Sequence, residues 1–369
     1  MDPVLEKEGE RANRGIRRIV LEGSPEEMGT CHGESYRDEI RAYAEDRVSL
    51  SSSGSWSGRA AGRQEVLELA ASMLPSHRAY SAALCAEMEA MARACDLSPA
   101  QAIIVGGFTD FVDALRSTGA GAPEEDDCTS VLVPNAMADG RGFLAQTWDM
   151  HASATEHVTL LDVRPNHSPR SLVFSTVGCL GQIGVNEAGI AIGINNLSAE
   201  VGRQGVTWPL VIREALAQTD LEAAVSSVTR APLTGAHHYL LMDGAGRGFD
   251  IEAMPQGCAI RELGEKPLVH TNHCLDAAMR KHESKKPPEL MASSQARLDR
   301  ATELLDCARV EVADLMDLTR DSQAICQVAK PPYHIESSGA TIMRPGTPEM
   351  WAVWGLPSEN EFSHFEFGE

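Results

Sequence analysis

A change of pattern at residue 128 constrains the fold of this chain more than any other sequence feature. Before it, helical signals dominate and only one short apolar run, Ile16 to Gly23, has the character of a strand. Ser117 to Asp127 is a loop of small residues that ends in acids. From Cys128 onward, β-rich apolar runs alternate with turn pairs and a few helical patterns. We therefore expect an α+β fold in which a helical segment precedes two layered sheets with helices outside.

Helix signals recur along the chain. Ser24-Pro25 followed by two glutamates combines a capping hydroxyl, an N1 proline and acids in the first turn. Further helices are expected over Glu65–Cys95, from Ser98-Pro99 toward Leu115, and in four later segments that include Trp208–Gln218. By contrast, Ser51–Gly62 (SSSGSWSGRAAG) has the composition of a flexible insert.

Charge and composition exclude some classes of partner. The chain carries 53 acidic and 32 basic residues, a formal net charge of −21, so nucleic acids and anionic membranes should be repelled. Residues 1–15 are expected to be a mobile tail without the apolar core of a signal peptide. No apolar run is long enough for a membrane span, and nine scattered cysteines without C-x-x-C suit reduced thiols. A cytoplasmic protein is the expectation.

Cys128 differs from the other cysteines in its context, because it follows an acidic loop and opens a β-rich run. A thiol at such a junction can be accessible and still be held in place, although a free cysteine is more often an inert core residue. Amides or carboxylates also end apolar runs at Asp149, Asn196 and Asn272. Side chains at strand ends often line sites, and turn formation is the alternative for each.

These segments, taken in order, resemble the family of isopenicillin-N acyltransferase, which includes hydrolases of linear amides. The matching motifs are Gly23-Ser24-Pro25-x-x-x-Gly29-x-x-His32-Gly33, Asp127-Cys128-Thr129-Ser130, Gln146-x-Trp148-Asp149, Gly184-x-Asn186-x-x-Gly189, Val269-His270-Thr271-Asn272-His273-Cys274-Leu275 and Gly339-Ala340-Thr341. Each motif alone is weak, but the ordered set extends from about Ile19 to the C-terminal strands.

The resemblance implies a four-layer αββα sandwich of the N-terminal-nucleophile class, made as a precursor. Cys128 would attack the Asp127 carbonyl, and cleavage would give segments 1–127 and 128–369 that remain one folded unit. The new α-amine, with a typical pKa of about 7.7–8.0 against about 8.5 for a thiol, can then accept the thiol proton. Nucleophile and base would share one residue, with no cofactor.

The same resemblance assigns roles to further residues. The Asn272 side chain and the Asn196 backbone N–H would stabilise the oxyanion, and Asp149 would support processing and substrate placement. Trp148 and Ser130 are weaker candidates for substrate contact.

Gln327 is the third weak candidate for substrate contact and marks a departure from the family. In the acyltransferase itself an arginine follows the corresponding Ser-Ile-Cys segment and helps to hold a substrate carboxylate, whereas Gln327 follows Ala324-Ile325-Cys326 here. A glutamine cannot make a charged bidentate clamp, so we expect a substrate other than a penicillin.

The expected reaction is hydrolysis of a small acyl amine through a thioester at Cys128. Transfer of an acyl group from acyl-CoA or an amide to an amine is the alternative within this family, and a non-catalytic binding protein on the same scaffold is the alternative outside it. Expected partners are the small-molecule substrate and the cleaved N-terminal segment. The sequence leaves the oligomeric state open, a homo-oligomer included.

Two further interpretations carry less weight. A papain-like protease would use Cys128, His270 and Asn272, but its cysteine needs a helix N-terminus, and the residues after Cys128 have strand character. A metal could use His270-x-x-His273-Cys274 or His237-His238, yet no second cluster has zinc-like spacing. We expect no metal, and we expect His32 to pack rather than to catalyse.

Overall fold

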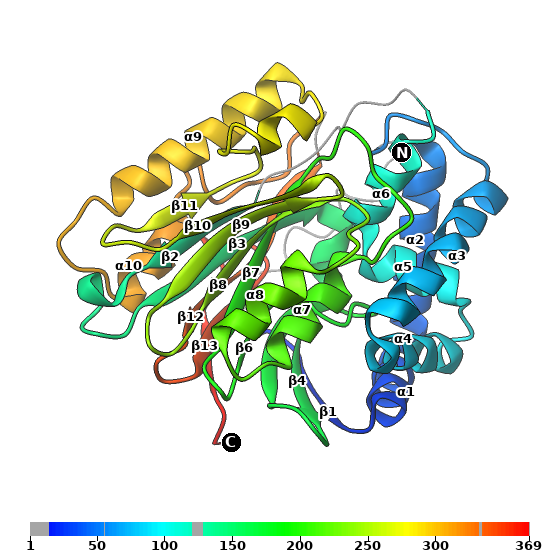
Figure 1. Ribbon diagram of the computed structural model, residues 1–369, viewed down its shortest axis with the longest axis horizontal. Helices are drawn as coiled ribbons and strands as arrows, with labels where there is room; N and C mark the ends of the chain where they lie inside the picture. Colours follow the sequence, from blue (N-terminus) through cyan, green and yellow to red (C-terminus); the bar gives the residue numbers. More distant parts are fainter. Residues whose placement is uncertain (1–14, 55, 120–127, 332–333, 369) are drawn as a thin grey trace.

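Two β-sheets form the centre of the protein (Figure 1), and the computed structural model describes residues 15–54, 56–119, 128–331 and 334–368. The eight-stranded sheet has the order β1-β4-β5-β6-β7-β8-β9-β10 and the six-stranded sheet the order β11-β2-β3-β12-β13-β14. The first contains β1 (Arg18–Gly23), β4 (Val158–Pro165), β5 (Ser171–Thr176), β6 (Ile183–Asn186), β7 (Ala191–Leu197), β8 (Ala236–Met242), β9 (Gly248–Met254) and β10 (Gly257–Glu262). The second contains β2 (Thr129–Val133), β3 (Phe143–His151), β11 (Leu268–His270), β12 (Ile335–Arg344), β13 (Glu349–Trp354) and β14 (Ser363–Glu366).

Helices cover both outer faces of this pair of sheets (Figure 1). Helices α7 (Trp208–Leu216) and α8 (Leu221–Thr229) contact the eight-stranded sheet, whereas α9 (Pro288–Leu304) and α10 (Val312–Arg320) contact the six-stranded sheet. Strands β2 and β3 contact β7 and β8 across the middle. The expected α+β class and four-layer αββα sandwich are therefore confirmed.

The N-terminal segment adds a helical unit beside the sandwich, at the right of Figure 1. It consists of α1 (Pro25–Ser35), α2 (Arg37–Ser53), α3 (Arg63–Tyr80), α4 (Ala82–Ala94), α5 (Pro99–Gly106) and α6 (Phe108–Arg116). Ser24 caps α1 as expected, in a capping box with Glu27. The helix expected over Glu65–Cys95 is divided at Ser81 into α3 and α4.

The helix expected from Ser98-Pro99 toward Leu115 is divided at Gly107, because the chain there touches the segment before α7. A β-carbon at Gly107 would lie 2.5 Å from the Thr207 Cβ, so only glycine permits this approach.

The segment Ser51–Gly62 is not a flexible insert. Its first three residues end α2, and Gly54 adopts the left-handed conformation (φ 78°) that closes the helix. Hydrogen bonds from the Gly58 N–H to the Gly54 carbonyl (2.9 Å) and from the Ala61 N–H to the Ser52 carbonyl (3.1 Å) fix the turn. Trp56 is 5% exposed. The small residues therefore serve a tight turn that buries a tryptophan, which composition alone does not reveal.

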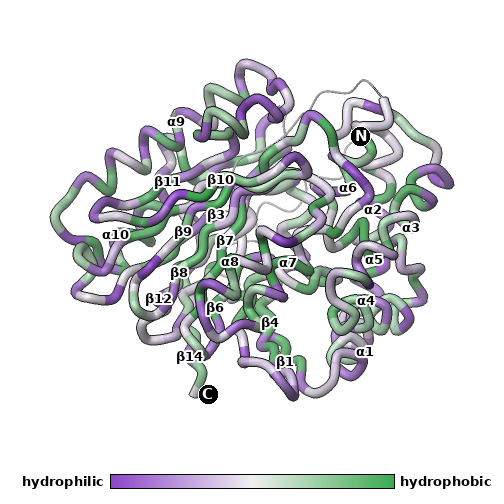
Figure 2. The backbone as a smooth tube through the Cα atoms, in the orientation of Figure 1, coloured by the Kyte–Doolittle hydropathy of each residue, from purple (hydrophilic) through white to green (hydrophobic). Residues whose placement is uncertain are grey.

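Hydrophobic residues concentrate in the strands between the layers (Figure 2). Alternation along β2 separates two clusters: Cys128 and Leu132 belong to the main core, while Val131 and Val133 pack in the cluster that contains residues of α9 and α10. The Cys128 side chain therefore belongs to the same packed interior as the inner face of β2.

Gln146 of β3 fastens one sheet to the other. Its Oε1 accepts the backbone N–H of Ile194 in β7 at 2.8 Å, and its Nε2 donates to the Ile194 carbonyl. Gly193 makes room for this amide, since a β-carbon there would lie 2.6 Å from the Gln146 Oε1. The clamp fixes β7, and with it Asn196, relative to β3.

Residues on both sides of 120–127 share one hydrophobic core. Strand β1 pairs in parallel with β4, and the Arg18 Nη2 donates to the buried Asp162 carboxylate at 2.8 Å. Such packing is what two segments of one folded unit require. The cut between Asp127 and Cys128 stays a prediction, and Asp127 and most of the expected tail (1–15) lie outside the described residues.

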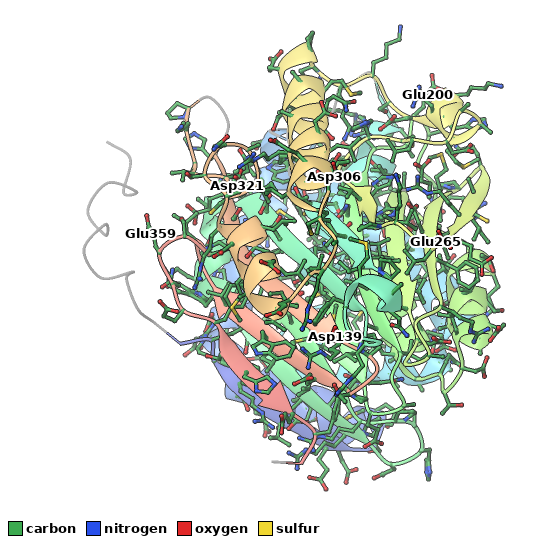
Figure 3. The ribbon with its side chains drawn as sticks, turned by 90° about the vertical axis from the view of Figure 1, so that its left-hand side faces the viewer. Asp139, Glu200, Glu265, Asp306, Asp321 and Glu359 are labelled. Carbon is green, nitrogen blue, oxygen red and sulfur yellow. The ribbon has the colours of Figure 1, made fainter. Side chains whose placement is uncertain are left out.

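Acidic side chains are spread over the surface rather than gathered at one site. Six of them lie in loops on different parts of the molecule, labelled in Figure 3: Asp139, Glu200, Glu265, Asp306, Asp321 and Glu359. The nine cysteines, all in the described part of the chain, are free thiols. None of the described helices has the length and hydrophobicity needed to cross a lipid bilayer.

The Gly193 contact predicts the effect of a single added methyl group. Gly193→Ala would press its β-carbon against Gln146 and the Leu144 Cδ2 (3.0 Å), and we expect the free energy of unfolding to fall by about 1–3 kcal/mol. Denaturant unfolding measures this change. Gly264→Ala is the control, because no heavy atom lies within 4 Å of its added carbon. Equal stability of the two variants would contradict the packing described.

His32 predicts part of the pH dependence of stability. Its Nε2 accepts the Gly178 N–H at 3.1 Å, and burial, together with the Arg213 charge, lowers its pKa from 6.5 to about 4. The unfolded chain therefore binds a proton as the pH falls below about 6.5, while the folded chain stays neutral until about pH 4.

This one group should cost about 2 kcal/mol of folding stability between pH 7 and pH 5. His32→Gln, which keeps an acceptor for Gly178, should reduce the fall in unfolding free energy by that amount. His167→Gln, at an exposed position, should leave the fall unchanged. A wild-type slope in the His32 variant would refute the assignment.

Candidate active site

Cys128 lies directly before β2 and is 5% exposed. Its Sγ accepts the Asp149 N–H at 3.4 Å and lies 3.7 Å from the Asp149 carbonyl oxygen. The residues that follow form a strand, so Cys128 does not begin a helix. This arrangement removes the basis for a papain-like site, which needs a helix N-terminus at the thiol.

The end of β3 brings Asp149 and Trp148 beside Cys128. Thr129 pairs with Thr147 across β2 and β3, and the Thr147 hydroxyl accepts the Thr129 N–H at 3.1 Å. The same hydroxyl donates to the Asp149 Oδ2 at 3.4 Å. The pairing of β2 with β3 therefore places the Asp149 carboxylate close to the Cys128 thiol.

Asn272 approaches from the loop after β11. Its Nδ2 donates to the Asn196 carbonyl at 3.0 Å, and its backbone N–H donates to the Ser294 hydroxyl at 3.0 Å. The Arg297 Nη2 donates to the Asn272 Oδ1 at 3.0 Å. Because the oxygen of the amide faces Arg297, its NH₂ group is directed toward the end of β7.

Arg297 links Cys128 to this amide, and it is not among the site residues predicted from the sequence. The side chain of Arg297, which belongs to α9, is completely buried. It donates to the Cys128 carbonyl, to the Thr129 Oγ1 at 3.2 Å and to the Asn272 Oδ1. A buried guanidinium requires such acceptors.

A signal for this arginine was present in the sequence. The buried positions of α9 follow helical spacing, and Arg297 occupies one of them: Leu290, Ser294, Arg297 and Ala301. An arginine on the apolar stripe of a helix is exceptional unless it meets buried acceptors.

A small cavity collects four of the predicted site residues. Its volume is about 30 Å³, and the residues that line it are Trp56, Thr109, Cys128, Trp148, Asp149, Met150, Ile194, Asn196, Trp208 and His237. Cys128, Trp148, Asp149 and Asn196 are therefore neighbours, although they come from three separate stretches of sequence. Asn272 joins them through its bond to the Asn196 carbonyl.

Ser130 has a supporting place and is not among the residues that line this cavity. Its Oγ accepts the Asn195 Nδ2 at 2.8 Å and donates to the His270 carbonyl at 3.4 Å. Asn195 also donates to the His270 and Thr271 carbonyls. The pair fastens the loop that carries Asn272 to both sheets.

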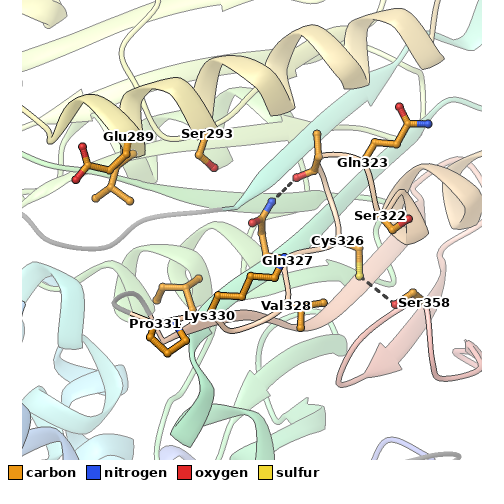
Figure 4. Close-up of a pocket in the computed structure, with 13 residues that line it drawn as sticks. Glu289, Ser293, Ser322, Gln323, Cys326, Gln327, Val328, Lys330, Pro331 and Ser358 are labelled. Carbon is orange, nitrogen blue, oxygen red and sulfur yellow. Dashed lines mark hydrogen bonds between the residues drawn. The ribbon is translucent and has the colours of Figure 1, made fainter.

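Gln327 lines a different cavity, of about 350 Å³ (Figure 4). The figure shows Ser293 of α9 directed toward it from above, with Lys330 below. The Gln327 backbone exchanges hydrogen bonds with Ser337, which pairs with Asp149 across β12 and β3. This larger cavity therefore adjoins the Asp149 side of the site without containing Cys128.

Glu252 of β9 also supports the Asn272 loop. Its carboxylate accepts the His270 Nε2 at 3.0 Å and the Leu275 and Asp276 N–H groups at 2.5 and 3.2 Å. Burial would raise the pKa of Glu252, but the bond and charge of His270 and these backbone donors outweigh it, so the pKa is lowered. The carboxylate is thereby kept ionised as an anchor.

The histidines near this anchor are arranged for packing rather than for joint metal coordination. His238, Asp250 and His270 hold potential ligand atoms within 4.8 Å, but the His238 and His270 rings stack with centroids 3.5 Å apart and an angle of 7°. A metal ion about 2.0–2.1 Å from imidazole nitrogens lies in the plane of each ring, and two stacked planes share no such point. His237 and His238, the other histidines considered for a metal, point to opposite faces of β8.

Sequence comparisons find known proteins that resemble this chain. The family model described as acyl-coenzyme A:6-aminopenicillanic acid acyl-transferase matches residues 136–354. The acyl-coenzyme A:6-aminopenicillanic-acid-acyltransferase 40 kDa form of Emericella nidulans is 24% identical over 261 residues, which cover 70% of this chain and 69% of that protein.

Two solved structures are also similar in part. A variant of the conjugated bile acid hydrolase of Clostridium perfringens superimposes with a TM-score of 0.47 and 11% identity, covering 65% of this chain and 97% of the other. Penicillin V acylase from Agrobacterium tumefaciens gives a TM-score of 0.40 and 14% identity, covering 62% and 82%.

The Arg297 contacts predict a defect in turnover rather than in substrate binding. Arg297→Lys keeps the charge but loses the planar fork whose two separate nitrogens reach Cys128 and Asn272, so we expect kcat to fall at least about tenfold, with KM changed far less. Arg300→Lys, one turn further along α9 and paired with Asp321 at 2.9 Å, should retain wild-type kcat. Steady-state kinetics of both variants measures this difference. Equal kcat values for the two variants would contradict a role for Arg297 in the site.

Proposed function

Because the chain belongs to the acyl-coenzyme A:6-aminopenicillanic acid acyl-transferase family, we propose that Cys128 becomes an N-terminal nucleophile and hydrolyses a linear amide of a small acyl amine. One observation carries this proposal: Cys128, Asp149 and Asn196 line the same cavity. Asn272 is joined to them by its hydrogen bond to the Asn196 carbonyl. The packed αββα frame supports it, since every group sits on a strand end or an anchored loop.

The first step is cleavage of the chain. The Cys128 sulfur attacks the Asp127 carbonyl carbon, the C–N bond breaks, and the nitrogen becomes the α-amine of Cys128. Water then hydrolyses the thioester and leaves the Asp127 carboxylate and the free thiol. Arg297, by holding the Cys128 carbonyl, keeps the residue in place while the bond on its other side breaks.

Turnover uses the amine that cleavage creates. The α-amine takes the thiol proton, and the thiolate attacks the substrate carbonyl. The Asn272 Nδ2 and the Asn196 N–H stabilise the oxyanion, and loss of one such donor typically costs about 100- to 1000-fold in rate. The amine product leaves with the proton, and water returns the acyl group as a carboxylic acid.

Acyl transfer is the second candidate, and the 350 Å³ cavity beside Asp149 favours it. In this reaction an amine acceptor takes the acyl group from the thioester in place of water, with acyl-CoA or an amide as donor. Gln327 supports hydrolysis or a non-penicillin acceptor, because the charged clamp is absent from this position. A thiol nucleophile and nine free cysteines suit a reducing compartment, and we include a cytoplasmic location in the proposal.

Intact mass spectrometry of the purified protein tests the processing step. Wild-type protein should give two fragments that co-elute under native conditions, the larger beginning Cys-Thr-Ser, because the cut needs the Cys128 sulfur. Cys128→Ala should remain one chain and be inactive toward amides. Cys258→Ala removes an exposed thiol and should cleave normally.

Two outcomes would overturn the proposal. One is an intact wild-type chain that hydrolyses amides. The other is a wild-type chain that stays whole, turns over nothing and resists thiol labelling at Cys128, which is the behaviour expected of a binding protein on this scaffold.

A further inference from the structure

We propose that the cavity beside Cys128 binds the acyl group of the substrate and that Trp56 restricts this group to a short, uncharged chain. The inference rests on the amide chemistry proposed for Cys128. It gives a function to the Ser51–Gly62 segment, which the catalytic steps leave unused.

Aromatic and apolar side chains form most of the cavity wall. Trp56, Trp148 and Trp208 are 5%, 5% and 6% exposed and line it together with Met150 and Ile194. Among the lining residues there is no lysine or arginine, and Asp149 is the acidic member. An acyl group that carries a carboxylate would meet an apolar surface and a like charge, so the cavity selects against it.

The walls are held from behind, which limits how far the cavity can widen. Trp56 packs edge-on against Phe108, with ring centroids 5.3 Å apart. The Trp208 backbone N–H donates to the Asp110 Oδ2 at 2.7 Å, and its indole N–H donates to the Thr109 hydroxyl at 3.2 Å. A volume of about 30 Å³ has room for one or two waters. Acyl groups of two to four carbons, whose carbonyl stays at the thiol and which place only a short tail in the cavity, therefore fit far better than longer ones.

The Trp56 indole supplies a second, independent sign that the cavity receives a ligand. Its Nε1 is buried and has no acceptor among the described residues, whereas the Trp208 indole N–H is satisfied by Thr109. A buried donor without a partner is unfavourable. Because Trp56 lines the cavity, an acceptor bound there within reach of this nitrogen, either water or an oxygen of the acyl group, would remove this cost.

Trp56 reaches the cavity because the turn after α2 is built to project it inward. Gly54 closes the helix with φ 78°, and a β-carbon there would lie 2.5 Å from the Ala60 backbone nitrogen. Trp56 and Thr109 precede the predicted cut, while Cys128 follows it. The acyl site is thus formed by both segments, and the N-terminal one contributes to specificity.

A series of N-acyl 4-nitroanilides tests the inference, because the amine stays constant while the acyl group varies. We expect wild-type kcat/KM to peak at acetyl to butanoyl and to fall at least about tenfold at hexanoyl and at glutaryl. Trp56→Ala should move the peak to longer chains by at least two carbons. Trp56→Phe, which keeps an aromatic wall, should retain the wild-type peak.

Trp351→Phe is the matched control, since Trp351 of β13 stacks on His364 of β14 with ring centroids 4.5 Å apart and does not line the cavity. It should reproduce the wild-type profile. If the alanine variant does not fold, Trp56→Leu serves instead. It also removes the indole ring from the cavity wall but leaves a larger side chain to pack in its place.

The two proposals fail in different ways. A chain-length profile that Trp56→Ala or Trp56→Leu leaves unchanged, while hydrolysis still requires Cys128, overturns the acyl-site inference alone. A wild-type preference for octanoyl or glutaryl over acetyl does the same. Absence of turnover with every anilide, together with an uncleaved chain, overturns the proposed function and the inference with it.

Discussion

A single buried guanidinium joins the parts of this site. Arg297 donates to the Cys128 carbonyl, the Thr129 hydroxyl and the Asn272 amide oxygen, so α9, the start of β2 and the loop after β11 depend on one group. Burying a cation is costly unless such acceptors surround it. That cost favours the arrangement in which all three acceptors stay around the guanidinium.

The remaining contacts extend this fixed point through the sandwich. Gln146 locks β7 to β3 across the sheets, and Glu252 anchors the loop that carries Asn272. The helical unit then closes the site with Trp56. The proposed cleavage before Cys128 would make such a frame necessary, since packing alone would then keep the two segments in register.

Much of the architecture could be predicted from local patterns. The pattern break at Cys128, the capped helix at Ser24 and the strand-end amides all appear in the structure where periodicity and turn chemistry put them. Arg297 and Trp56 could not be found in this way, because a lone arginine in a helix and a tryptophan among serines and glycines acquire meaning only from distant partners. Asn196 and Cys128 become neighbours through a sheet-to-sheet contact that carries no short-range signal.

The central claim is that the acyl group passes through the sulfur of an N-terminal Cys128. Acid quenching of the protein during turnover of a good amide, followed by peptide mapping, tests it most directly. The account predicts an acyl thioester on a peptide that begins at Cys128 and bears a free α-amine. Acyl groups on another residue, or on a peptide that still contains the bond between Asp127 and Cys128, would contradict it.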